Sequence, residues 1–93
     1  MTRPDPTVPS FRAGPLRAAP VGTACVVRAV TAPASNPDLK SQLEDIGFVP
    51  GESVLVTVRG FPGDDPLAVR VGQSTFALRA AEAAYIEVEA VAQ

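Results

Sequence analysis

The residues of this chain that could do chemistry are few: an acidic pair, Asp64 and Asp65, and a single cysteine, Cys25. The two carboxylates could offer oxygens to a divalent cation. A dedicated calcium site, however, uses about six to eight oxygen ligands, far more than two adjacent aspartates supply. We therefore expect a solvated turn at this point of the chain, with an incidental metal ion at Asp64 and Asp65 as the weaker alternative.

The residue types that most enzymes need are missing from the sequence. There is no histidine, so the commonest general base and the commonest metal ligand are both absent. A lone cysteine excludes an intrachain disulfide and a thiolate zinc cluster, and Cys25, set among apolar residues, is expected to be a buried, inert thiol. No phosphate-binding loop pattern occurs either. We expect no enzyme activity and no cofactor.

Length and composition indicate one small folded domain. The chain has 93 residues, of which 46% are hydrophobic and 19% are charged, so disorder of the whole chain is not expected. A net charge of −2 argues against a protein built mainly to hold phosphate backbones. No apolar run approaches the ~20 residues that span a membrane, and the first residues lack a signal-peptide core. We expect a cytoplasmic protein without direct membrane insertion.

Proline divides the chain into two parts. Five of the ten prolines fall in the first twenty residues, where each fixes φ and removes a backbone donor. We interpret residues 1–13 as a flexible tail and residues 14–91 as the folded domain.

The first half of the domain is predicted to be a strand followed by a short helix. Residues 23–30 are apolar on nearly both faces, as in a buried strand. Asn36 and Pro37 are a suitable N-cap and first helical residue, and Gly47 stands where a helix would end in the left-handed region. Between these two ends, Leu39, Leu43 and Ile46 form one apolar stripe along the predicted helix.

The second half is predicted to be a three-stranded meander. Pro50-Gly51 favours a type II turn, and strands follow at residues 52–59 and 67–71. Gly72-Gln73 has the composition of a two-residue hairpin turn. Because side chains alternate between the two faces, this turn fixes the register. It predicts two apolar rows, Val56–Val69–Phe76 and Val58–Leu67–Leu78.

A helical turn over residues 79–84 and a last strand over residues 85–88 complete the order. The predicted fold is mainly β: a small five-stranded SH3-like barrel, with a short α-helix inserted between strands 1 and 2 and a helical turn before the last strand.

Three segments resemble the FeoA-domain family. Leu43-Glu-Asp-Ile-Gly-Phe-Val-Pro-Gly51 is similar to its signature L-x-x-(L/M)-G-(hydrophobic)-x-P-G, and the segments around Pro66 and Leu78 resemble two further motifs downstream. Together they cover roughly residues 15–89. The resemblance assigns structural roles to the motif residues Gly47, Pro50, Gly51, Pro66, Leu78, Arg79 and Ala83.

The resemblance implies an accessory protein of bacterial ferrous iron uptake. Proteins of this family accompany the membrane ferrous iron transporter FeoB, whose own GTPase domain would bind the nucleotide. The expected partner is therefore the cytosolic side of a FeoB-like transporter. The candidate partner-binding residues are Lys40, Gln42, Glu44, Asp45, Phe61, Asp64 and Tyr85.

A second hypothesis belongs to another class. Related domains form the C-terminal module of iron-dependent repressors, which makes this chain an SH3-like regulatory module of iron-dependent transcription control or a nucleic-acid-associated domain. A stripe of Arg28, Arg59, Arg70 and Arg79 could support it, but interleaved stacking aromatics are missing, so no nucleic acid is expected. Self-association stays open, because a barrel this small has open edges.

Overall fold

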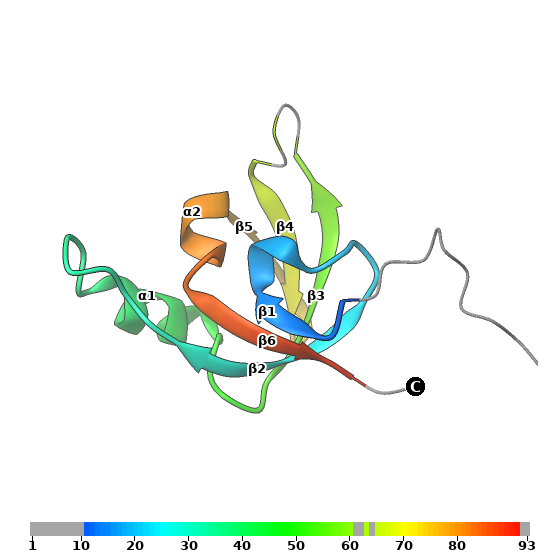
Figure 1. Cartoon of the computed structure of the whole chain (residues 1–93), viewed down its shortest axis with the longest axis horizontal. Helices are drawn as coiled ribbons and strands as arrows, with labels where there is room; N and C mark the ends of the chain where they lie inside the picture. The colour runs from blue at the N-terminus through cyan, green and yellow to red at the C-terminus, as the bar shows by residue number, and fades with distance from the viewer. Residues whose placement is uncertain (1–10, 61–62, 64, 92–93) are drawn as a thin grey trace, which may run out of the picture.

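The computed structural model describes residues 11–60, 63 and 65–91. Its elements are β1 (Ala13–Pro15), the 3-10 helix η1 (Leu16–Ala18), β2 (Ala24–Val30), α1 (Leu39–Ile46), β3 (Ser53–Arg59), β4 (Leu67–Val71), β5 (Ser74–Leu78), α2 (Ala80–Ala83) and β6 (Ile86–Ala90). All neighbouring strands are antiparallel and form one six-stranded sheet in the order β1-β6-β2-β3-β4-β5 (Figure 1).

The core lies on one side of this sheet. Phe48 and Leu16 are fully buried, together with apolar residues from every strand except β1. Leu16 comes from η1 and Ala83 from α2, and these two short helices contact one another. Because the described residues include no buried charged side chain, hydrophobic packing supplies the main stabilisation of the fold.

The predicted count of five strands was wrong. The sheet has six strands, not five, and it is open, with β1 and β5 as its two edges. The strand that was missed is β1. It contains Gly14 and Pro15, two residue types that are unfavourable in a β-strand, so the sequence did not indicate a strand there. Proline is tolerated on an edge strand, where its missing N–H need not enter the ladder, and β1 lies at such an edge beside β6.

The last residues of the segment interpreted as a flexible tail, residues 1–13, are among those that the structure describes. Phe11 already packs against the core, and Ala13 begins β1. The rest of the tail predicted for residues 1–13 lies outside the described residues.

The meander follows the predicted register except at one place. Val69 lies opposite Phe76, Leu67 opposite Leu78 and Val56 opposite Val69, as expected. The register then shifts between Val56 and Val58, so Val58 pairs with Ala68 and Arg59 with Leu67. The predicted row Val58–Leu67–Leu78 was therefore wrong, because this bulge turns Val58 away from the core and leaves the residue 58% exposed.

The helix begins later than the sequence suggested. Asp38 precedes the first helical residue, Leu39, and Asn36 instead accepts a backbone hydrogen bond from Leu39 in a turn. Leu39 and Leu43 are buried as the apolar stripe predicted, while Ile46 is half-buried. Because of the extra strand, this helix lies between the second and third strands rather than the first and second. No helix among the described residues is long and apolar enough to cross a bilayer.

Candidate partner-binding surface

The end of α1 is built by the segment that resembles the family signature. Gly47 has φ 129°, its N–H donates to the Glu44 carbonyl at 3.0 Å, and the Phe48 N–H donates to the Leu43 carbonyl at 3.0 Å. This pair of bonds is the Schellman pattern, which closes a helix through a residue with positive φ. A Cβ on Gly47 would lie 3.1 Å from Val71, so φ and packing both favour glycine here.

The Pro50-Gly51 turn then connects α1 to the sheet. Glu52 donates to the Val49 carbonyl at 3.0 Å across the turn, and Gly51 has φ 92°, as a type II turn requires at that position. The turn is also tied to β2, because Val27 accepts from Gly51 at 2.8 Å and donates to Glu52 at 2.8 Å. The backbone groups of this turn are thus used in hydrogen bonds that hold the fold together.

The third resembling segment forms the start of α2. Leu78 and Ala83 are buried, and the backbone N–H of Arg79 donates to Glu82 Oε1 at 2.9 Å. Glu82 at the third helical position thereby satisfies a donor just outside the helix, as in one half of a capping box. The side chain of Arg79 is exposed.

Asp65 has a structural role that the sequence did not reveal. Its Oδ1 accepts a hydrogen bond at 3.0 Å from the backbone N–H of Ala80, the first residue of α2. A carboxylate at this place caps the helix from a distant loop. The next residue, Pro66, accepts a bond at 2.7 Å from the Gly60 N–H and so closes the base of the same loop.

The carboxylates do not form a metal centre within the described residues. No group of three or more acidic, histidine or cysteine side chains that could hold a metal ion occurs there. Asp65 is bound to α2, and Asp64, its proposed partner in an incidental site, lies outside the described residues together with Phe61.

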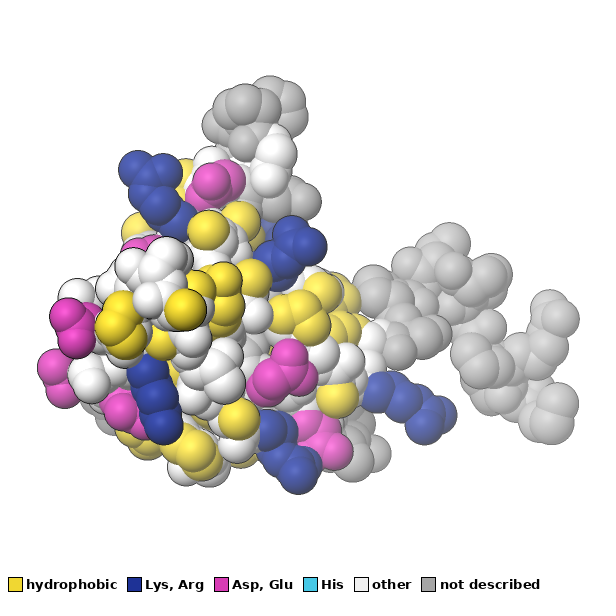
Figure 2. All heavy atoms as spheres, turned by 60° about the vertical axis from the view of Figure 1, so that its left-hand side comes forward, with side chains coloured by type: hydrophobic (Ala, Val, Ile, Leu, Met, Phe, Trp, Pro, Cys, Tyr) yellow, Lys and Arg dark blue, Asp and Glu magenta, His cyan; other side chains and the backbone are white. Residues whose placement is uncertain are grey.

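The outward side of α1 presents the predicted contact residues to solvent. Lys40, Gln42 and Asp45 are exposed, and Glu44 is half-buried. Figure 2 brings this side of the molecule forward: acidic side chains gather at its left edge, while hydrophobic atoms gather toward its centre. α1 therefore offers a polar helical surface of mixed charge beside apolar surface.

Tyr85 lies where α2 passes into β6 and is half-buried against the core. Its backbone carbonyl accepts from the Thr31 N–H at 2.9 Å, which fixes the chain after β2 beside it. Ala32 and Ile46 are two further half-buried apolar residues that pack against the core. Ala32 and Ile46 were not among the expected contact residues, because the position of Ala32 indicated a loop and that of Ile46 the apolar stripe of the helix.

The arginines do not form one free basic stripe. Arg28 forms an ion pair with Glu89 on the neighbouring strand, and an Nη2 of Arg59 donates to the carbonyl of Ala19. Arg70 and Arg79 are exposed. At least two of the four cations are thus bound by other groups of the protein.

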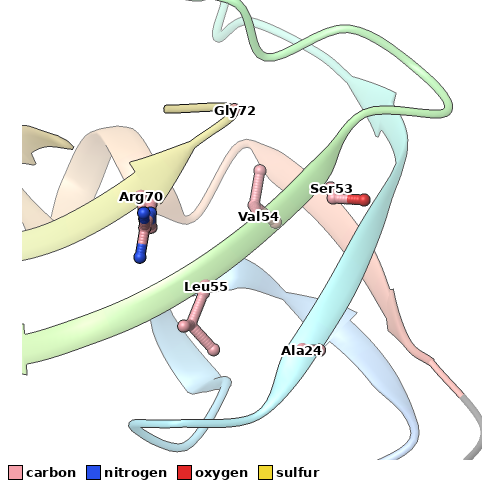
Figure 3. Close-up of a pocket in the computed structure, with 6 residues that line it drawn as sticks. All are labelled: Ala24, Ser53, Val54, Leu55, Arg70 and Gly72. Carbon is pink, nitrogen blue, oxygen red and sulfur yellow. The ribbon is translucent and has the colours of Figure 1, made fainter. Parts of the chain in front are cut away.

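A shallow hollow of about 130 Å³ lies on the outer face of the sheet. It is lined by residues of β2, β3 and the β4–β5 hairpin, which Figure 3 labels: Ala24, Ser53, Val54, Leu55, Arg70 and Gly72. Small-molecule sites usually enclose about 300–1,000 Å³. The hollow is too small to favour a cofactor.

Cys25 is buried in the core, with its thiol donating to the Thr23 carbonyl at 3.4 Å. Burial raises the pKa of this thiol, because the charged thiolate loses hydration inside the protein. The thiol is neutral at physiological pH and is a core residue, as the sequence predicted.

A curved antiparallel sheet with short helices at its ends defines a small SH3-like β domain, a scaffold that usually binds through its surface. The FeoA domain matches residues 14–90, and the chain therefore belongs to the FeoA-domain family.

Solved structures give the same fold. FeoA of Stenotrophomonas maltophilia, determined with zinc and described as a procaryotic SH3 domain protein, is 37% identical, with a TM-score of 0.73 and coverage of 81% of this chain and 88% of that one. Iron(II) transport protein A of Clostridium thermocellum is 30% identical over 83% of this chain and 45% of that chain, with a TM-score of 0.73.

A manganese-dependent transcriptional repressor shares the fold alone. It is 21% identical, with a TM-score of 0.73, and the match covers 91% of this chain but 45% of the repressor. The comparison with curated protein sequences found no match.

Proposed function

We propose that this chain is a cytoplasmic accessory protein of bacterial ferrous iron uptake, which binds the cytosolic side of the GTPase-containing iron transporter FeoB and modulates it. The observation that carries the proposal is the FeoA domain over residues 14–90. The Stenotrophomonas relative, 37% identical, is described as a candidate ferrous iron transport activating factor. On this proposal the protein is an adaptor and not an enzyme.

The outward side of α1 is the proposed docking surface. Its exposed residues Lys40, Gln42 and Asp45 take no part in the core, whereas Leu39 and Leu43 anchor the helix from the other side. A surface of this kind leaves the fold unchanged when its side chains vary. Tyr85, half-buried against the core, is the proposed apolar contact.

Modulation then requires unequal binding to two states of the transporter. A ligand shifts a conformational equilibrium only by the difference between its affinities for the two states. We therefore propose that the chain binds one nucleotide state of the transporter's GTPase domain more tightly than the other.

A binding titration tests this proposal. The purified full chain is titrated against the full-length transporter in detergent, without nucleotide and with GDP or a non-hydrolysable GTP analogue. Saturable binding whose Kd changes with the nucleotide is the expected result. Absence of binding in all three conditions would contradict the proposal.

Charge reversal locates the docking surface. The double variant Lys40→Glu, Asp45→Lys keeps the net charge and should weaken binding about tenfold, or about 1.4 kcal/mol. The matched control, Arg17→Glu with Glu87→Lys, reverses two exposed charges away from α1 and should leave Kd unchanged. Equal affinities for both double variants would exclude α1 as the contact.

The repressor-like fold supports a second candidate, a regulatory module for iron-dependent transcription. This role predicts that the chain binds DNA together with a separate DNA-binding polypeptide, with an affinity that falls steeply with salt. A mobility shift at two salt concentrations distinguishes it from the transporter role.

A further inference from the structure

The two edges of the sheet differ in how they are protected. β1 has only three residues and contains Gly14 and Pro15. Short strands and prolines are devices that stop an edge from pairing with another chain. β5, at the other edge, spans Ser74–Leu78 and contains no glycine, proline or charged residue. β5 is therefore the edge that can accept a further strand.

The hairpin register shows which backbone groups of β5 are free. The turn at Gly72-Gln73 has two residues, so Val71 and Ser74 form a hydrogen-bonded pair, and such pairs alternate with non-hydrogen-bonded ones along the ladder. Thr75 and Ala77 consequently direct their N–H and C=O groups away from β4. Among the described residues, no backbone hydrogen bond joins β5 to any segment other than β4. Both residues are exposed.

We propose that this edge pairs with β5 of a second copy of the chain, antiparallel and with the two-fold axis at Phe76. In this register Thr75 of each copy lies opposite Ala77 of the other. These are the residues whose backbone groups point outward, so both pairs exchange N–H···O=C bonds across the axis. The edge is thus complementary to itself, as a two-fold interface requires.

Phe76 at the centre of the strand favours the same register. It is half-buried and packs against the core from the inner face. On the axis, the two Phe76 residues form a non-hydrogen-bonded pair, in which the Cα atoms are about 4.5 Å apart and the side chains are close. Pairing covers the remaining exposed surface of each ring and adds an aromatic cross-strand contact.

Charge does not oppose the pairing. The nearest cations are Arg70, which lies opposite Thr75 on β4, and the exposed Arg79, which directly follows β5. With the axis at Phe76, the two Arg79 residues lie three residues beyond it on either side, about 20 Å apart along the strands. In the proposed dimer the two Arg70 residues are separated by three strand spacings, about 14 Å laterally. At physiological salt, exposed charges beyond a Debye length of about 8 Å are largely screened. The interface is small, so the dimer is expected to be weak and concentration-dependent.

Sedimentation equilibrium of the full chain over a wide concentration range tests the dimer. Ala77→Pro removes an outward N–H without breaking a β4 bond, and should raise the dimer dissociation constant at least tenfold. Thermal unfolding at low concentration checks that the variant still folds. A wild-type chain that stays monomeric at millimolar concentration would overturn the proposal, and would leave the edge to a strand from another protein.

A pair of lysine variants separates the edge from the outer face. Ala77→Lys places a charge on β5, and Val58→Lys places the same charge on the exposed bulge of β3. The first should weaken the dimer severalfold, and the second should leave it unchanged. If Val58→Lys is the more disruptive change, the face rather than the edge makes the contact, and the proposal fails.

Disulfide trapping tests the register. Thr75→Cys and Ala77→Cys are prepared separately in a Cys25→Ala background and oxidised alone and mixed. The proposed pairing places residue 75 opposite residue 77 of the partner copy, with Cα atoms about 5.5 Å apart, within disulfide range. A covalent dimer should form in the mixture and only weakly in either variant alone. Efficient trapping of either variant by itself would contradict this register.

Discussion

Two connecting segments of this protein are held in place in opposite ways. The segment from Leu43 to Gly51 is ordered by its own residues: a glycine with positive φ, a fully buried Phe48 and short-range hydrogen bonds. The loop from Gly60 to Pro66 is fixed at its base by the bond between those two residues and at Asp65 by distant α2. The first segment can be predicted from local residue types, whereas the second depends on tertiary contacts.

Phe48→Ala is the change expected to affect the first segment most. Phe48 is fully buried in the core directly after the Schellman closure, and deleting a buried aromatic ring costs about 3–5 kcal/mol. That loss is a large part of the stability of a domain of this size. Urea unfolding should show a much lower midpoint. A change below about 1 kcal/mol would mean that the segment does not depend on this side chain.

Gly60→Ala should have the largest effect on the second segment. A Cβ at this position would lie 2.5 Å from the Pro66 carbonyl oxygen and 2.7 Å from the Asp65 carbonyl carbon, both backbone atoms. Relieving this overlap requires a backbone shift that costs about 1–3 kcal/mol. Gly63→Ala in the same loop is the control, because nothing lies within 4 Å of its Cβ and only its φ of +74° is strained. Equal losses for the two variants would contradict the close approach at Gly60.

Features of the fold that have a local sequence signature were predictable, whereas features that depend on distant contacts were not. The helix closure at Gly47 and the hairpin at Gly72-Gln73 have local signatures, and both are present. β1 could not be found, because its pairing partner β6 lies at the other end of the chain and its own residues, Gly14-Pro15, argue against a strand. The bulge that exposes Val58 has no glycine to signal it.

In the candidate site, too, the placement of some residues is set by local periodicity and that of others by distant contacts. Exposure of Lys40, Gln42 and Asp45 was predictable from the periodicity of α1, since buried leucines fix the opposite side. Their role in docking remains a prediction. Asp65 could be identified as acidic but not as a cap, because Ala80 is remote in sequence and only the fold brings it near.

Asp65→Ala should produce a moderate loss of stability in the second segment. It removes the carboxylate that accepts from the Ala80 N–H, and losing an N-terminal cap costs about 0.5–2 kcal/mol. Asp65→Asn keeps an oxygen acceptor at the same place and should lose markedly less. Urea unfolding of both variants and the wild type measures the two losses in the free energy of unfolding. Identical losses would show that the acceptor atom is not what stabilises α2.

The smallest expected effect is a pH dependence that comes from the buried part of the molecule. Burial raises the pKa of Cys25 above the ordinary thiol value of 9.0, so the folded state retains this proton at a pH where the unfolded state loses it. The unfolded state is therefore favoured progressively as the pH rises through 9.0 toward the folded pKa, and this contribution is negligible at pH 7.

Comparison with Cys25→Ala isolates this contribution from those of other groups that titrate at alkaline pH. The stability difference between the wild type and Cys25→Ala should be constant near neutrality and should shift against the wild type above pH 9.0. Urea unfolding at a series of pH values measures it. A difference that stays constant across the alkaline range would mean that the thiol ionises equally easily in both states, contrary to its burial in the core beside the β2 backbone.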